Sequence, residues 1–161
     1  MVPAVRGVSA LGSGVMLTTV VVGVAGYFVF HRRRRAALTI TAASVGGTIL
    51  DMVLKAIAER PRPTVVPHLT DVITSSFPSG HTLLSAIIYL SVGIAIAQSR
   101  VSSRSAFLVI GSAVLLTLSV GISRVYLGVH YPTDVLAGWA AGLGWALLSV
   151  AVAASVKPGR S

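Results

Sequence analysis

The 161-residue sequence contains no cysteine, and acidic residues are scarce. The absence of cysteine excludes disulfide bonds, thiolate catalysis and cysteine-based metal sites. Only 11% of the residues are charged, and 4 acidic residues stand against 13 lysines and arginines. A soluble domain of this size carries roughly twice that charged fraction. The low charge therefore argues against a soluble globular protein.

Apolar residues make up 54% of the chain, and the mean hydropathy is +0.86. They gather in long runs, several of which approach or exceed the roughly 20 residues that a helix needs to cross a bilayer. We therefore predict an all-α polytopic integral membrane helix bundle that forms one membrane-embedded domain over residues 1–161. Its five transmembrane helices are expected at about residues 8–30, 36–57, 79–98, 106–122 and 135–156.

The formal net charge of +9 could indicate a nucleic-acid or anionic-lipid partner. The arginine run at residues 32–35 joins two apolar spans directly, which favours a short cytoplasmic loop over a headgroup or nucleic-acid patch. Eight basic residues and no acidic one fall on the same side as this run: Arg32, Arg33, Arg34, Arg35, Arg100, Arg104, Lys157 and Arg160. The positive-inside rule then predicts a multi-pass protein of the cytoplasmic (inner or plasma) membrane, with the C-terminus in the cytoplasm and no nucleic-acid partner.

Three polar clusters fall on the opposite, extracytoplasmic side, each at the end of a predicted span. The first is Lys55 and, after six residues, Arg62 and Pro63; the second is Pro78, Ser79, Gly80 and His81; the third is Ser123, Arg124, His130 and Asp134. Because each cluster lies at a helix end, packing of the bundle can bring the three together at one membrane edge.

The chemistry of these clusters is complementary and suits a phosphate. Lysine and arginine can hold a phosphate and the charge that develops during its transfer. A serine hydroxyl and a glycine amide add neutral donors. Two imidazoles, His81 and His130, are the minimum for one nucleophile and one general acid, and Asp134 can orient His130. The cationic side chains of the clusters, Lys55, Arg62 and Arg124, would repel a divalent ion, so we expect a site without metal or cofactor.

The remaining polar residues near these clusters have simpler interpretations. Asp51 and Lys55 are four residues apart on one helix face, which predicts a structural ion pair. Arg60 and Arg62 each precede a proline and should be extended. His68 and Asp71, in the loop at residues 64–77, are interpreted as ordinary solvated side chains.

The three motifs resemble the three-part signature of the type 2 phosphatidic acid phosphatase superfamily, over about residues 45–145. That superfamily includes membrane lipid phosphatases, glucose-6-phosphatase and the vanadium haloperoxidases. All three parts are present, in order and without substitution. The resemblance implies that His130 is a nucleophile that forms a phosphohistidine, that Asp134 orients it and that His81 protonates the leaving group. It also implies a phosphate cradle of Lys55, Arg62, Ser79, Gly80 and Arg124.

We therefore expect a membrane phosphatase that hydrolyses a phosphomonoester or diphosphate on a lipid headgroup, outside the cytoplasm. Candidate substrates are polyprenyl diphosphate or monophosphate, phosphatidylglycerophosphate, phosphatidic acid and a polyprenyl-linked sugar phosphate. A phosphotransferase with the same first half-reaction and a non-catalytic protein that binds or flips lipid phosphates stay open, as does a homo-oligomer. Bacterial members of the family commonly have six membrane helices, so five predicted spans imply a chain without the first of them.

Overall fold

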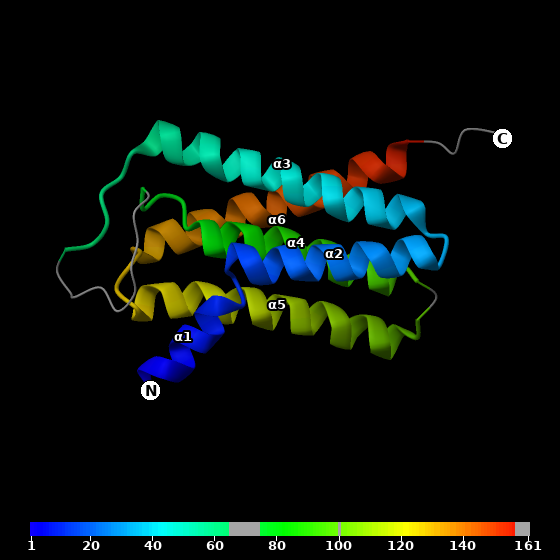
Figure 1. Cartoon of the computed structure of the whole chain (residues 1–161), viewed down its shortest axis with the longest axis horizontal. Coiled ribbons are helices and arrows are strands. Elements are labelled where there is room, and N and C mark those ends of the chain that lie inside the picture. Colours follow the sequence, from blue (N-terminus) through cyan, green and yellow to red (C-terminus); the bar gives the residue numbers. More distant parts are fainter. Residues whose placement is uncertain (65–74, 100, 157–161) are drawn as a thin grey trace.

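The computed structural model describes residues 1–64, 75–99 and 101–156, and the regular structure in these ranges is entirely helical. The helices are α1 (Val2–Ala10), α2 (Gly14–Phe30), α3 (Arg34–Ala58), α4 (Gly80–Ala97), α5 (Ser103–Tyr126) and α6 (Pro132–Ser155). Figure 1 shows α2 to α6 lying roughly along one direction, with α1 inclined to them. The prediction of an all-α bundle is confirmed.

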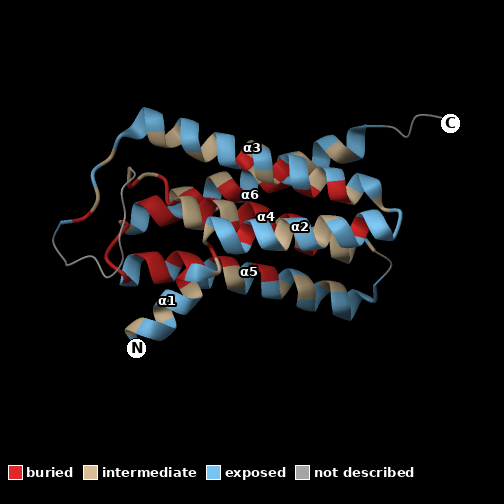
Figure 2. Cartoon of the chain, in the orientation of Figure 1, coloured by how far each residue is buried: buried red, intermediate tan, exposed pale blue. Residues whose placement is uncertain are grey.

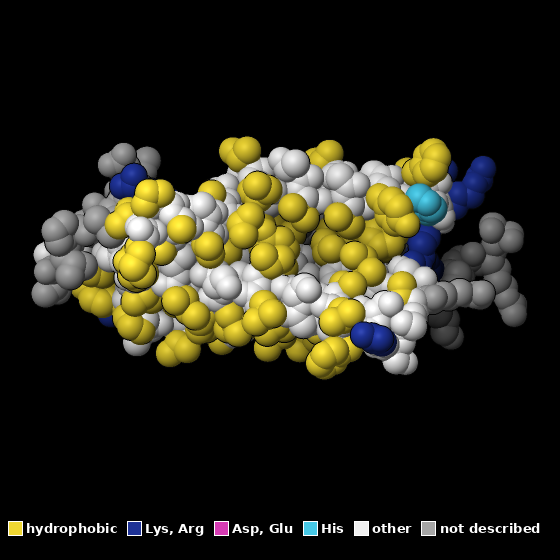
Figure 3. Space-filling model, turned by 90° about the horizontal axis from the view of Figure 1, so that it is seen from below, with side chains coloured by type: hydrophobic (Ala, Val, Ile, Leu, Met, Phe, Trp, Pro, Cys, Tyr) yellow, Lys and Arg dark blue, Asp and Glu magenta, His cyan; other side chains and the backbone are white. Residues whose placement is uncertain are grey.

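Within the described residues, α3, α4, α5 and α6 are each long and apolar enough to cross a membrane. A fifth span exists if α1 and α2 are taken together, and the two meet at a bend of 44°. Large apolar side chains such as Phe107, Leu115 and Leu148 are exposed. Figure 3 shows hydrophobic side chains over the flank of the bundle and Lys and Arg at its two ends. This is the surface of a multi-pass membrane protein, because lipid chains accept apolar side chains that water would not.

A single continuous helix over residues 8–30 was the expectation, and it is wrong. The helix breaks at residues 11–13, where Gly12 lies so close to the next elements that a Cβ would be 3.2 Å from the His81 carbonyl oxygen. The Tyr89 hydroxyl donates to the Leu11 carbonyl oxygen at 2.7 Å, and the Met16 amide donates to Ser13 Oγ at 3.3 Å. The break is tolerated at membrane depth because its polar groups are satisfied inside the protein.

The other predicted spans agree with α3, α4 and α6 to within a few residues, but α5 is longer than the expected 106–122. It begins where Ser102 Oγ accepts a hydrogen bond from the Ser105 amide at 3.1 Å. It continues through Ser123 and Arg124, whose side chains are buried. A polar pair therefore does not mark the end of a membrane helix when the protein itself surrounds it.

The centre of the bundle is α4, and Figure 2 shows much of the buried surface on it. It packs parallel to α6 (Figure 1), and small residues line the contact between the two helices. A Cβ at Gly142 would lie 2.6 Å from Ala86 Cβ, and one at Gly138 would lie 3.0 Å from the Ser79 carbonyl oxygen. Small residues four apart on α6 thus allow the two helices to approach closely. As a result, the beginnings of α4 and α6 lie side by side, and the Ser79 amide donates to the Asp134 carbonyl oxygen at 3.1 Å.

Candidate active site

The structure brings the three polar clusters together at one end of the bundle. This end is formed by the end of α3, the beginnings of α4 and α6, and the end of α5 (Figure 1). The arginine run at residues 32–35 lies at the opposite end. His68 and Asp71 lie outside the described residues, so the geometry below rests on the three clusters and their neighbours.

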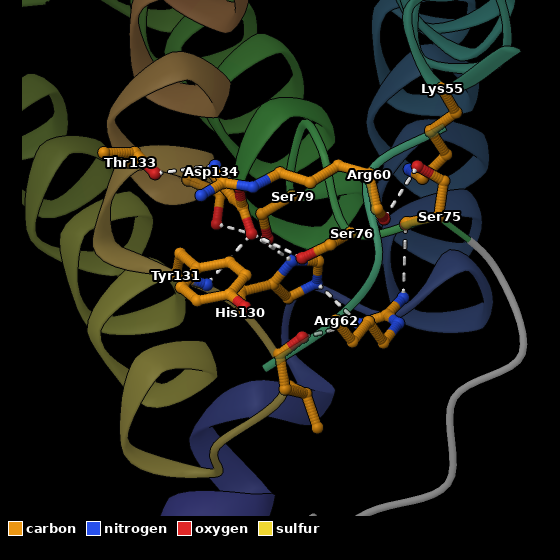
Figure 4. Close-up of polar contacts among 12 residues, drawn as sticks. Lys55, Arg60, Arg62, Ser75, Ser76, Ser79, His130, Tyr131, Thr133 and Asp134 are labelled. Atoms are coloured by element: carbon orange, nitrogen blue, oxygen red, sulfur yellow. Dashed lines mark hydrogen bonds and ion pairs between the residues drawn. The ribbon is translucent and has the colours of Figure 1, made fainter. Parts of the chain in front are cut away.

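His130 lies in the short connection between α5 and α6, where Gly128 turns the chain with a φ of 73° that favours glycine. Its imidazole is 4% exposed and lies between Asp134 and Arg62 (Figure 4). Nδ1 is 3.5 Å from Asp134 Oδ2, and Nε2 is 3.2 Å from Arg62 Nη1. Nδ1 makes no hydrogen bond within the described residues at this separation. One ring nitrogen thus faces a carboxylate and the other faces a cation.

Burial lowers the pKa of His130, and the charges of Arg62 and Arg124 lower it further. The imidazole is therefore neutral near pH 7 and keeps a lone pair on one nitrogen, as a nucleophile requires. Burial also lowers the pKa of Arg62, an effect that the charge of Asp134 opposes. The Arg62 side chain further donates to the Val129 carbonyl oxygen at 2.8 Å, which fixes it beside His130.

Asp134 is completely buried, and both of its carboxylate oxygens are bound. Arg60 Nη1 donates to Oδ1 at 2.8 Å, while Ser76 Oγ and the Tyr131 amide donate to Oδ2 at 2.5 and 2.9 Å. A buried carboxylate needs such partners because desolvation without them is costly. The bond from Tyr131 also closes the first turn of α6, which Pro132 begins. Asp134 is therefore rigidly placed next to His130.

Two of these contacts were not predicted from the sequence, those of Arg60 and Ser76 with Asp134. For Arg60 a signal was present. It was expected to be extended like Arg62, and alternate side chains of an extended chain point to the same side. If Arg62 reaches His130, then Arg60 is directed to the same region. No comparable pattern marks Ser76, which lies among several polar loop residues.

The Asp51–Lys55 ion pair predicted from the sequence is present, with Lys55 Nζ 2.5 and 2.6 Å from the two carboxylate oxygens. This pair lies against Gly80 at the beginning of α4, where a Cβ would be 2.6 Å from Lys55 Nζ. Only glycine fits without moving the lysine. Next to it, Ser79 Oγ accepts a hydrogen bond from Thr82 Oγ1 at 2.9 Å, so its own proton can be donated to a ligand.

Arg124 is 4% exposed and is oriented by α1, because its Nη1 donates to Ser9 Oγ at 2.8 Å. Its Nε has no hydrogen-bond partner within the described residues. The contact with Ser9 was not predicted and has no signal in the sequence. His81 stands in the first turn of α4, close enough to Arg124, Lys55 and Arg62 for their charges to act on it. All eight residues of the predicted site are thus at one end of the bundle.

The described residues contain no group of three or more His, Cys, Asp or Glu side chains that could hold a metal ion. Comparison with known families identifies the arrangement. The model of the PAP2 superfamily matches residues 35–157. The chain belongs to the PAP2 superfamily.

Individual PAP2 proteins are similar over most of this chain. Phosphatidylglycerophosphatase B of Bacillus subtilis (strain 168) is 34% identical over 85% of this chain and 68% of its own length. The undecaprenyl-diphosphatase of Sulfolobus acidocaldarius is 31% identical over 77% of this chain and 58% of its own length.

The fold is also that of a solved PAP2 protein. The crystal structure of a transmembrane PAP2 type phosphatidylglycerolphosphate phosphatase from Bacillus subtilis superposes with a TM-score of 0.91 at 31% identity. The superposition covers 99% of this chain and 79% of that one. The expected fold and the expected class, a membrane lipid phosphatase and hence a hydrolase, are confirmed.

Proposed function

We propose that this PAP2 phosphatase releases phosphate from a lipid headgroup through a phosphohistidine on His130. The observation that carries the proposal is the position of the imidazole. Nδ1 faces the fixed carboxylate of Asp134, and Nε2 faces the cationic side of the site at Arg62. A carboxylate beside Nδ1 favours the imidazole tautomer that is protonated at Nδ1, and this tautomer has its lone pair on Nε2.

In the first half-reaction, Nε2 attacks the phosphorus and the bond from phosphorus to the lipid oxygen breaks. His81 donates a proton to that oxygen as it leaves. In the second, water attacks the phosphohistidine and gives a proton to His81, the bond from phosphorus to Nε2 breaks, inorganic phosphate is released and both histidines return to their starting states. Throughout, Asp134 stabilises the charge that develops on His130.

The phosphate oxygens are bound by Lys55, Arg62, Arg124, the Ser79 hydroxyl and the Gly80 amide. Arg62 has a double role in this scheme. Without substrate it donates to Nε2 at 3.2 Å, and on binding it transfers that hydrogen bond to the phosphate, which frees the lone pair. Arg124 brings an Nε that has no hydrogen-bond partner within the described residues, so it can donate without breaking another bond.

The substrate that we propose is a lipid with a small phosphorylated headgroup, phosphatidylglycerophosphate first and a polyprenyl diphosphate second. The phosphatidylglycerophosphatase and the undecaprenyl-diphosphatase noted above support this choice. A site at the end of membrane-spanning helices also favours a lipid over a soluble sugar phosphate.

We further propose that the site faces outward from the cytoplasmic membrane. The support is the charge asymmetry, since the end with the arginine run at residues 32–35 carries the basic excess that favours the cytoplasm. A reporter fused after Ser161 should be cytoplasmic, and an extracytoplasmic reporter would contradict this orientation.

The experiment that tests the proposal measures phosphate release by the purified protein from phosphatidylglycerophosphate, polyprenyl diphosphate and phosphatidic acid. His130→Ala should reduce the rate by several orders of magnitude, because it removes the nucleophile. His31→Ala, which removes an exposed histidine at the other end of the bundle, is the matched control and should keep full activity. Full activity in His130→Ala would exclude the mechanism. If released phosphate accounts for less than the substrate consumed, the enzyme is a phosphotransferase instead.

A further inference from the structure

A second site lies at the opposite end of the bundle from His130. A cavity of about 530 Å³ opens there between the beginning of α3 and the ends of α4 and α6. All four arginines of the run at residues 32–35 line it. Its other walls are largely apolar and include Ile40, Ile94 and Ala153. A cavity with a cationic mouth and an apolar interior matches an amphiphile with an anionic headgroup.

The charge at this end is unbalanced. The three acidic residues in the described part of the chain, Asp51, Glu59 and Asp134, belong to the end of α3 and the beginning of α6, at the active-site end. Arg33 is already engaged, since it donates to Ser99 Oγ and to the Gln98 carbonyl oxygen. Within the described residues, the side chains of the other three arginines of the run make no hydrogen bond or ion pair, so they can bind an anion without breaking a described contact.

Inside the cavity, Ser91 supplies a separate indication of a ligand. Ser91 lines the cavity and is 2% exposed, and its Oγ has no hydrogen-bond partner within the described residues. A serine inside a helix can donate to the carbonyl oxygen four residues earlier, as Ser44 in α3 and Ser149 in α6 do here at 2.8 Å. A buried hydroxyl without a partner is costly. An ester or phosphate oxygen in the cavity would remove that cost.

We propose that this cavity binds an anionic phospholipid of the surrounding membrane, with the phosphate against the arginines and the glycerol ester region against Ser91. Guanidinium groups bind phosphate through paired hydrogen bonds, and basic pockets between membrane helices suit acidic headgroups. The cavity lies at the end of the candidate membrane-spanning helices, and the ends of such helices meet the headgroup region of a bilayer. The lipid bound there is not the substrate, because His130 is at the other end of the bundle.

The first test compares lipid binding to the intact, purified chain by native mass spectrometry in detergent, with phosphatidylglycerol and phosphatidylcholine of equal chain length. We expect phosphatidylglycerol to bind at least about five-fold more tightly. Arg35→Gln should lower this preference for phosphatidylglycerol by about five-fold. The matched control is Arg104→Gln, which removes an exposed arginine at the same end that does not line the cavity, and it should have no effect. Equal losses in the two variants, or no preference between the lipids, would overturn the proposal.

The second test blocks the cavity without changing any charge. Ala153 lines the cavity, whereas Ala151 is exposed on the same helix and does not. Ala153→Phe should abolish the preference for phosphatidylglycerol and Ala151→Phe should keep it; the same effect in both would contradict the proposal. Both tests are repeated with saturating vanadate, which occupies a phosphate-binding active site. Displacement of phosphatidylglycerol by vanadate would place the lipid at the active site and overturn the second site.

Discussion

Arg60 and Asp134 form an ion pair that joins the segment after α3 to the first turn of α6, with Arg60 Nη1 2.8 Å from Asp134 Oδ1. The carboxylate is completely buried, whereas the arginine side chain is 37% exposed. The guanidinium also lies over the Tyr131 ring, 4.2 Å from its centroid. Arg60 thus binds the oxygen of Asp134 that does not face His130, and Oδ2 remains directed at the imidazole.

We therefore expect Arg60→Gln to lower kcat by about ten- to a hundred-fold, the effect of losing a hydrogen bond to a charged group. KM should change little, because Arg60 contacts Asp134 rather than the substrate. Steady-state kinetics of phosphate release measure the two separately. Thr133→Ala is the matched control, since it removes the other acceptor of Arg60 Nη1 and leaves the ion pair intact. A higher KM at unchanged kcat would show that Arg60 binds phosphate directly.

Arg62→Gln should raise the pKa of His130, because it removes a positive charge 3.2 Å from Nε2 that opposes protonation of the ring. The titration is followed by NMR of the protein labelled with ¹³C-histidine, without substrate. Arg104→Gln also removes one positive charge, but at the other end of the bundle, and should leave the pKa of His130 unchanged. The kcat of the same Arg62 variant should fall by about a hundred- to a thousand-fold, because the variant lacks a hydrogen-bond donor to the transition state. An unchanged pKa would refute the electrostatic role of Arg62.

Ser9→Ala should weaken substrate binding although Ser9 lies in α1, outside the residues that match the family model. Loss of the hydroxyl leaves the buried Arg124 guanidinium without its partner at 2.8 Å. We expect about a ten-fold higher KM. Ser9→Thr retains a hydroxyl and should restore binding. Ser13→Ala removes a nearby cap that does not touch Arg124, and an equal rise in KM there would point to disturbance of α1 and α2 instead.

Chelation should not inhibit this enzyme. Lysine and arginine side chains take the place of a metal in the proposed cradle, and the carboxylates of Asp51 and Asp134 are already engaged by Lys55 and Arg60. The measurement is phosphate release with and without EDTA. Activity that is lost with EDTA and restored by a divalent cation would contradict a metal-independent mechanism.

Most of the site could be predicted from the sequence because its residues stand at fixed spacings beside apolar spans. The helix ends that carry Lys55, Ser79 and Asp134 follow from hydropathy, and bundle packing then places them together. What could not be predicted depends on tertiary contacts. Ser76 and Ser9 contact the site through hydrogen bonds that no local pattern encodes.

The same reasoning explains the two errors in the membrane spans. Hydropathy reports apolar character and not the continuity of a helix. It therefore predicts one helix over residues 8–30, although the helix is interrupted at Gly12, where the chain lies close to His81. Conversely, the span expected at 106–122 stops just before the polar Ser123 and Arg124, and an isolated arginine is costly in lipid. Burial against Ser9 removes that cost, and α5 continues to Tyr126.

The close parallel packing of α4 and α6 has an electrostatic consequence. Both helices begin at the same place, so the positive ends of two helix dipoles, each roughly half an elementary charge, converge on the site. Asp134 in the first turn of α6 occupies one of them. The other, at Gly80 and His81 in α4, remains for the phosphate. This part of the positive potential belongs to the backbone and does not titrate, so it persists at every pH at which the bundle stays folded.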